Sequence, residues 1–163
     1  MTAIRRILIT TDLSDCSKEA LQHAIYLARQ LDAELYLLHV FEPPVYTQSN
    51  LPTLHPSVRQ WIDDLRMAES RKFDAMAKEV GQEGIKLNPL FKEGTPFITV
   101  LQTAEAIQAD LIVLGTHGRT GLDRLLMGSV AERVVRQAPC PVFIVRPKGH
   151  VAHVVKEEKG GAR

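Results

Sequence analysis

Residues 111–135 read LIVLGTHGRTGLDRLLMGSVAERVV and carry the strongest structural signal in the chain. The apolar run at the start predicts a buried β-strand, and the spacing of apolar residues at the end predicts an α-helix. Between them lies a loop with the spacing Gly115-x2-Gly118-x9-Gly128-Ser129. Glycine lets the backbone approach an anion closely, and the first N–H groups of a helix have no intrahelical partners. The order strand, glycine loop, helix start therefore predicts a phosphate-binding site.

The sequence excludes other familiar motifs of α/β proteins. It contains no G-x-x-x-x-G-K-[ST] segment, so it lacks the lysine that reaches the outer phosphates in P-loop proteins. No G-x-G-x-x-G follows the first predicted strand, which argues against a dinucleotide-binding Rossmann domain. No G-x-S-x-G segment marks the nucleophile of an α/β-hydrolase. The phosphate site is instead expected late in the chain, after the penultimate strand.

Predicted strands and helices alternate along the whole chain. We expect helices from Ser14 or Asp15 to Leu31, from about Ser57 to Val80, from Thr95-Pro96 onward and over about 129–137. In the second of these, the inward residues are expected to be Val58, Ile62, Leu65, Met76 and Val80. The strands are expected at 6–11, 34–40, 86–91, 110–114 and 142–146. This alternation predicts a single doubly wound α/β domain, with a parallel sheet and helices on both faces, over residues 1–147. Residues 148–163 are predicted to be a C-terminal tail.

Composition and charge restrict the possible partners. The 163 residues suffice for one domain. A net charge of +1, from 20 basic and 19 acidic residues, gives no overall attraction to nucleic acid. No segment has the length of a membrane span or the pattern of a signal peptide, so we expect a cytoplasmic protein without membrane insertion. The six histidines show no zinc-ligand spacing with the two cysteines.

The glycine spacing resembles the ATP-binding signature of the universal stress protein family. Four other segments are similar to family blocks in the same order, namely ILITTDLSDCSKEAL (7–21), ELYLLHV (34–40), FKEGTPFITVL (91–101) and APCPVFIVRP (138–147). The resemblance covers roughly residues 4–147 and implies a five-stranded sheet in the order 3-2-1-4-5. In such a sheet the ligand lies where the winding direction reverses, here between strands one and four. Asp12 and Gly115 end these two strands.

The resemblance also implies roles for residues at the strand ends. Asp12 would meet the nucleoside or position a hydrated Mg²⁺ or Mn²⁺ ion, with capping of the first helix as the alternative. Thr11 fits the family pattern, whereas Thr10 replaces a proline that is common there. Val40 corresponds to the residue whose backbone binds the adenine edge. His39, on an apolar strand, is interpreted as a hydrogen-bonded core residue rather than a ligand.

The glycine loop is expected to hold the phosphates. Ser129 offers a hydroxyl and an N–H to phosphate, and it is also a candidate helix cap. Arg119, Arg124 and His117 are candidates for phosphate contact, with a solvated surface position as the alternative for each. The predicted nucleotide-binding set is Thr11, Asp12, Val40, Leu114, Gly115, His117, Gly118, Arg119, Gly128, Ser129 and Val130.

The resulting prediction is an ATP-binding stress-response or regulatory protein in which nucleotide stabilises a conformation or an interaction surface. Two alternatives stay open: a slow ATPase or nucleotidyl-transfer enzyme, and a nucleotide-free interaction module with the same fold. No general base or nucleophile is evident beside the loop, so no catalytic residue is assigned. The short apolar segment 141–145 has a free edge as the last strand, and the resemblance implies a homodimer through it. A regulatory protein partner is a further expectation.

Overall fold

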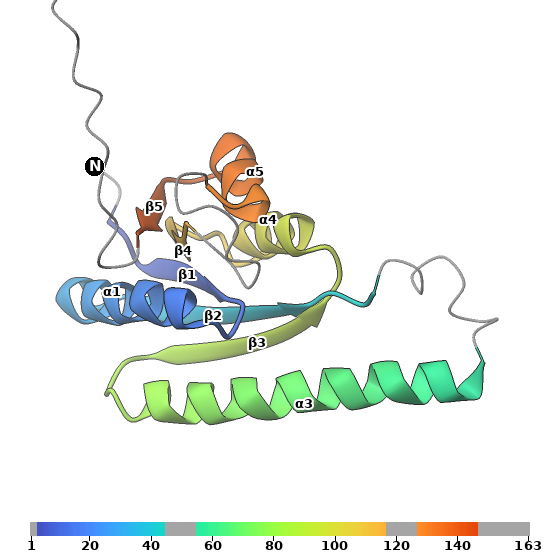
Figure 1. Cartoon of the computed structure of the whole chain (residues 1–163). Helices are drawn as coiled ribbons and strands as arrows, with labels where there is room; N and C mark the ends of the chain where they lie inside the picture. Colours follow the sequence, from blue (N-terminus) through green and yellow to red (C-terminus); the bar gives the residue numbers. More distant parts are fainter. Residues whose placement is uncertain (1–2, 45–54, 117–126, 147–163) are drawn as a thin grey trace, which may run out of the picture.

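Five parallel strands form the centre of the structure, a computed structural model that describes residues 3–44, 55–116 and 127–146. The sheet has the order β3-β2-β1-β4-β5 (Figure 1). Its strands are β1 (Arg6–Thr11), β2 (Glu34–Phe41), β3 (Leu87–Glu93), β4 (Leu111–Gly115) and β5 (Val142–Val145). Every neighbouring pair is parallel. The predicted fold class and strand order are therefore confirmed.

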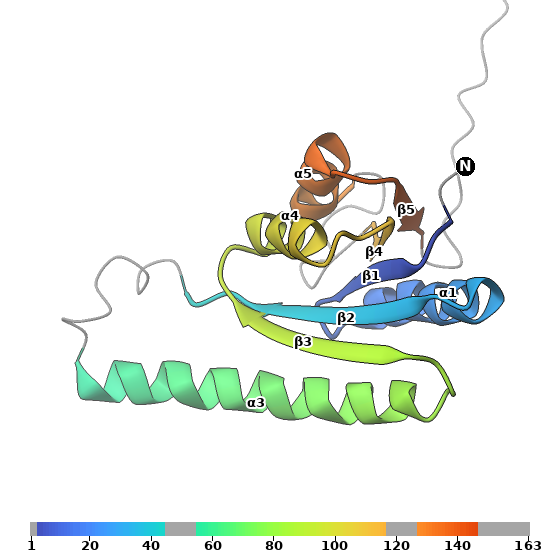
Figure 2. The ribbon, with the colours of Figure 1, turned by 180° about the vertical axis from the view of Figure 1, so that it is seen from behind.

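Helices cover both faces of this sheet. The helices are α1 (Asp15–Leu31), α3 (Pro56–Gly81), α4 (Pro96–Ala106) and α5 (Ser129–Gln137). Helices α1 and α3 lie on one face, and α4 and α5 lie on the other (Figures 1 and 2). None of the helices in the described ranges is long and apolar enough to cross a bilayer. The arrangement is the doubly wound one expected from alternating strands and helices.

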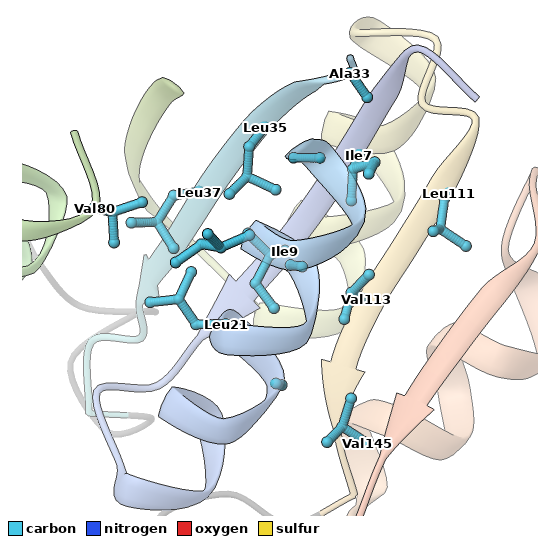
Figure 3. Packing of buried hydrophobic residues seen from close by; sticks show 14 of the residues in the cluster. Ile7, Ile9, Leu21, Ala33, Leu35, Leu37, Val80, Leu111, Val113 and Val145 are labelled. Atoms are coloured by element: carbon cyan, nitrogen blue, oxygen red, sulfur yellow. The ribbon is translucent and has the colours of Figure 1, made fainter. Parts of the chain in front are cut away.

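Two apolar clusters hold the layers together. Ile7 and Ile9 of β1 pack with α1 and α3, whereas Leu8 packs with α4 and α5. The same alternation places Val113 of β4 in the first cluster and Ile112 in the second, because successive strand side chains point to opposite faces. Both faces are covered, which explains why these strands are apolar on both sides. Figure 3 shows the first cluster, where each fully buried aliphatic side chain contributes about 1.5–3 kcal/mol relative to an exposed one.

The burial pattern of α3 differs in part from the prediction. Ile62 and Val80 are buried as expected, but Leu65 is 37% exposed, and the fully packed residue is Phe73. The N-terminal half of α3 extends past the end of β3 (Figures 1 and 2). The apolar residues Trp61 and Met67 of this half are also exposed. The prediction for Leu65 was wrong because the buried stripe of α3 passes through Ile62, Phe73 and Val80 and leaves Leu65 beside it, which helical periodicity alone does not resolve.

A glycine brings the start of α4 close to the end of β2. Gly94 has φ of +147°, and its N–H donates to the carbonyl oxygen of Phe41 at 3.0 Å. A Cβ at this position would lie 2.8 Å from Thr99 Oγ1, so only glycine fits without displacement. The helix then begins as predicted, with Thr95 as N-cap and Pro96 as first residue. This turn places α4 beside the carboxyl end of the sheet.

Candidate functional site

A cavity of about 430 Å³ lies at the carboxyl ends of the central strands. Thr11 comes from the end of β1, Val40 from near the end of β2, and Gly115 from the end of β4. The β1–β4 pair is the point where the winding direction reverses, since β2 and β3 lie on one side and β5 on the other. Ligands of doubly wound proteins bind at this position. The cavity is therefore the candidate functional site.

Eight residues of the predicted nucleotide-binding set fall within the described ranges, and all eight border this cavity. They are Thr11, Asp12, Val40, Leu114, Gly115, Gly128, Ser129 and Val130. The other three, His117, Gly118 and Arg119, lie outside the described residues, as does Arg124. The residues that sequence reasoning missed include Pro96 and Val100 of α4, Ala131 and Val134 of α5, and Glu42 and Glu69.

The turn from β1 to α1 is fixed by side-chain hydrogen bonds. Thr11 Oγ1 accepts from the Leu13 N–H at 3.0 Å and lies 2.9 Å from Ser17 Oγ. Asp12 Oδ1 accepts from the Ser14 N–H at 3.1 Å and from Ser14 Oγ at 2.5 Å. Ser14 itself is the N-cap of α1, accepting from the Ser17 N–H. Asp12 therefore stabilises the turn before the cap, and the alternative that it caps α1 was wrong.

The first turn of α5 forms the opposite wall of the cavity. The N-cap of α5 is Gly128, without a side-chain cap bond, and Ser129 is the first helical residue. The alternative that Ser129 caps α5 was therefore wrong, because Gly128 has the extended backbone of the capping position, with φ of −59° and ψ of 148°. Ser129, Val130 and Ala131 border the cavity. The N–H groups of a first helical turn have no partner within their helix, and the helix dipole gives that end a partial positive charge.

The end of β2 forms a third wall of the cavity and extends beyond the end of β1. Pairing of β1 with β2 ends at Thr11 and His39, whereas pairing of β2 with β3 continues to Phe41 and Glu93. Beyond His39, β2 therefore runs without β1 beside it. Val40 lies in this projecting part, and its side chain packs against the α4–α5 cluster. The projecting backbone of β2 is the part of this wall that can meet the edge of a flat ligand.

A buried histidine joins two elements at the cavity wall. His39 is 2% exposed, and its Nδ1 lies 2.8 Å from the carbonyl oxygen of Thr11. Its Nε2 lies 2.9 Å from Oε2 of Glu69, in the middle of α3. The interpretation of His39 as a hydrogen-bonded core residue is confirmed. Glu69 was not predicted as a site residue. A glutamate in a polar helical stretch resembles any solvated side chain, and the neighbouring sequence does not indicate its partner.

The described lining of the cavity is acidic. It contains the carboxyl groups of Asp12, Glu42 and Glu69, and no lysine or arginine occurs among its described residues. Within these same ranges, no group of three or more His, Cys, Asp or Glu side chains is placed to hold a metal ion by itself. An anionic ligand would therefore meet positive potential mainly at the start of α5, with its phosphates turned toward that helix.

Comparisons with known proteins agree with this geometry. The family model described as the universal stress protein family matches residues 3–146. Universal stress protein MJ0531 of Methanocaldococcus jannaschii is 39% identical over 145 residues, which cover 87% of this chain and 82% of that protein.

Solved structures of universal stress proteins have a similar fold. Universal stress protein UspA from Lactobacillus plantarum has a TM-score of 0.77 and 26% identity, covering 90% of this chain and 100% of that one. The universal stress protein from Archaeoglobus fulgidus in complex with dAMP has a TM-score of 0.61 and 18% identity, covering 88% and 98% of the two chains. Since the family model matches a stretch that includes every described residue, this chain belongs to the universal stress protein family.

Proposed function

We propose that this chain binds an adenine nucleotide, ATP, with a divalent cation, in the cavity at the carboxyl ends of β1, β2 and β4. Bound nucleotide would stabilise one conformation or interaction surface of the protein. The observation that carries the proposal is the convergence of the predicted residues. They come from four separate segments, 11–12, 40, 114–115 and 128–130, and border one cavity of about 430 Å³. A cavity of this size suits a small-molecule ligand.

The phosphates are assigned to the start of α5. Ser129 and Val130 bring the first N–H groups of the helix to the cavity, and Gly128 adds no side chain that would keep a phosphate away. The helix dipole favours negative charge at this end. The Ser129 side chain is exposed and takes no part in capping, so its hydroxyl is available as a donor. These features support a phosphate position built mostly from backbone.

The base is assigned to the wall formed by β2 and α4. Val40 and Leu38 of β2, with Pro96 and Val100 of α4, give this part of the cavity an apolar surface. An aromatic base gains from burial against such side chains. The part of β2 that projects beyond β1 supplies backbone donors and acceptors to the base edge. In the dAMP complex from Archaeoglobus fulgidus, the same fold holds an adenine nucleotide.

Asp12 is assigned to the cation, either Mg²⁺ or Mn²⁺. Mg²⁺ usually keeps several waters and binds through one or two carboxylates together with substrate phosphates. One oriented carboxylate beside a phosphate position meets that requirement, although it would not hold a metal without nucleotide. The hydrogen bonds from Ser14 to Oδ1 give Asp12 a defined orientation. The cation would neutralise phosphate charge in an otherwise acidic cavity.

We propose binding rather than rapid turnover. His39, the one imidazole among the described lining residues, uses both ring nitrogens in hydrogen bonds with Thr11 and Glu69. A histidine engaged in this way is poorly suited to act as general base for a water at the phosphates.

Calorimetric titration with ATP and Mg²⁺, together with mass spectrometry of nucleotide retained after gentle purification, tests the proposal. At a hundredfold excess over Kd, a ligand of the native state adds about 2.7 kcal/mol of stability. The melting temperature should therefore rise by several degrees with ATP and Mg²⁺. A protein that carries no nucleotide and melts identically with and without ATP would support the nucleotide-free module. Turnover near the ~10 s⁻¹ median of enzymes would support the enzyme.

A further inference from the structure

We propose that His39 is a positioning residue of the nucleotide site, and that Glu69 of α3 holds its ring in the orientation this role requires. The inference rests on the proposed function and adds to it two residues whose main contacts are with the protein. In this proposal α3, which packs on the α1 face of the sheet, also supports the cavity through the contact of Glu69 with His39.

The hydrogen-bond partners determine where the protons lie. The carbonyl oxygen of Thr11 only accepts, so Nδ1 of His39 carries a hydrogen and donates it over 2.8 Å. With Nδ1 assigned, Nε2 either donates to the Glu69 carboxylate or accepts from its protonated form over 2.9 Å. In both cases one proton lies between Nε2 and Oε2. The Thr11 carbonyl thus secures the Nδ1–H form, and Glu69 orients the ring through Nε2, as outer carboxylates orient histidines in metal and catalytic sites.

The surroundings of the ring keep it in this orientation. His39 is 2% exposed and stacks on Phe73, with ring centroids 6.0 Å apart. Phe91 lies on a second side, at a centroid distance of 5.4 Å. A rotation of the imidazole would remove both hydrogen bonds inside an apolar environment, where unpaired polar groups are strongly disfavoured. The contacts therefore define one position for Nδ1.

The group that His39 holds is the last carbonyl of β1. The ladder between β1 and β2 ends at the pair Thr11 and His39, and the chain then turns away toward α1. Because the peptide unit is planar, fixing the Thr11 carbonyl also fixes the N–H and Cα of Asp12. The Thr11 hydroxyl accepts a further hydrogen bond from the Leu13 N–H. His39 therefore sets the direction in which the Asp12 carboxylate leaves the chain.

Two substitutions at position 39 separate the two hydrogen bonds. His39→Asn places an amide N–H near the position of Nδ1, so it keeps the bond to Thr11 and loses the bond to Glu69. His39→Gln reaches the position of Nε2, so it keeps Glu69 and loses Thr11. If His39 positions the site through Thr11, ATP affinity measured with Mg²⁺ should fall by roughly tenfold or more in His39→Gln and by only about threefold in His39→Asn. Loss of core packing alone would affect both variants similarly.

A second pair of variants tests the role of Glu69. Glu69→Gln can still donate an amide N–H to Nε2 of a neutral ring with Nδ1–H, whereas Glu69→Leu cannot. The expected order of MgATP affinity is wild type, then Glu69→Gln, then Glu69→Leu. Asp74→Asn removes a negative charge from an exposed position of the same helix that does not border the cavity, and it serves as the control. If His39→Gln does not fold, the comparison of Glu69→Gln with Glu69→Leu tests the proposal in place of the two position-39 variants.

The binding data should show which part of the ligand is affected. Since His39 acts through Asp12, the loss in His39→Gln should be larger for ATP with Mg²⁺ than for adenosine. Equal losses for both ligands, or equal MgATP affinities of folded His39→Gln and His39→Asn, would overturn the proposal.

Nitrogen-15 NMR of the nucleotide-free protein gives an independent measurement. The imidazole of His39 should show a protonated Nδ1 in the wild type, in Glu69→Gln and in Glu69→Leu, because the Thr11 carbonyl accepts from Nδ1 in all three. The Nε2 resonance should differ in Glu69→Leu, where Nε2 has lost its partner. An unprotonated Nδ1 in the wild type would overturn the assignment. If the wild type binds no ATP, the proposed function fails, whereas the NMR result still decides whether His39 holds the Thr11 carbonyl through Nδ1–H.

Discussion

The backbone N–H of Gly128 donates a hydrogen bond to the carbonyl oxygen of Thr116 over 2.7 Å. Thr116 follows β4 directly, and its own N–H donates to the carbonyl oxygen of Val145 at the end of β5. The two ends of the glycine loop are therefore held together, and the N-cap of α5 is attached to the sheet. A helix start fixed in this way offers its N–H groups to a phosphate without an ordering cost at the moment of binding.

This relationship makes Gly128 the first residue to test. We expect Gly128→Val to stay folded, because φ of −59° and ψ of 148° are accessible to any residue. The branched side chain should crowd the phosphate position and lower ATP affinity by roughly tenfold or more. Calorimetry measures the affinity and circular dichroism the fold, with Gly128→Ala expected to show a smaller loss. Undiminished affinity in the folded valine variant would remove the phosphate assignment.

Ser129→Ala should affect the ligand more than the fold. As Ser129 is the first helical residue and not the N-cap, its loss should change the free energy of unfolding by within about 0.5 kcal/mol, typical of a surface substitution. A lost N-cap would cost about 1 kcal/mol instead. The increase in melting temperature caused by MgATP should be smaller than in the wild type. An unchanged increase would show that the hydroxyl does not contact phosphate.

Asp12→Ala should weaken the effect of the cation. The variant loses the proposed contact with hydrated Mg²⁺, so adding Mg²⁺ should improve ATP affinity less than it does in the wild type. Asp12→Asn is the matched control for the turn, because its side-chain oxygen can still accept from the Ser14 N–H. Titrations with and without Mg²⁺ measure the difference. If both variants respond to Mg²⁺ like the wild type, the cation is held elsewhere.

We expect a homodimer that pairs through β5. Among the described residues this strand is last in the sheet, with no partner strand on its outer edge, and Phe143 on it is 42% exposed. The ring of Phe143 meets that of His23 on α1 edge-on, with centroids 6.1 Å apart, which gives the exposed side chain a defined orientation. Light scattering at micromolar concentration should show a dimer for the wild type and a monomer for Phe143→Asp. A monomeric wild type, or a dimer that persists in the variant, would contradict this assignment.

Acid should remove the stabilising contribution of Asp110 at the opposite end of the sheet. Its Oδ2 accepts from the backbone N–H groups of Arg5 and Arg6, both at 2.9 Å. The bond from Arg5, above all, lowers the pKa of Asp110 below its ordinary value of 3.8, while partial burial opposes the shift.

A pKa lowered in the folded state gives stability that is present above the ordinary value and lost as pH falls through the folded value. Asp110→Asn should therefore lose less stability than the wild type when chemical unfolding is compared at neutral pH and below about pH 4. Equal losses in the two proteins would show that this carboxylate does not contribute.

The strands and helices were predictable because their apolar residues follow local periods. β1 and α5 have the predicted bounds, β5 ends one residue earlier than predicted, and β3 begins one residue later and ends two residues later. The starts of α1 and α4 were predictable because the cap Ser14 and the first-turn residue Pro96 act within one turn of themselves. The exposure of Leu65 depends instead on which side of α3 faces the rest of the domain, which no local pattern encodes.

The location of the candidate site was predictable for a similar reason. Asp12 and Gly115 end strands, and the carboxyl ends of neighbouring parallel strands meet at one edge of a sheet. The pairing of His39 with Glu69 was not predictable, because the two residues lie thirty positions apart and on different elements. Their hydrogen bond depends on the packing of α3 against β2, which exists only in the folded chain.

The stagger between β1 and β2 has a consequence for how this wall tolerates sequence change. Since β2 runs beyond β1 from Val40 to Phe41, the surface assigned to the base edge is main chain, which is the same for every residue type except proline. Drift at position 40 would then alter the width of the cavity while its donors and acceptors stay in place. Homologous proteins could carry other side chains at position 40 and still offer the same backbone hydrogen-bonding groups to a base.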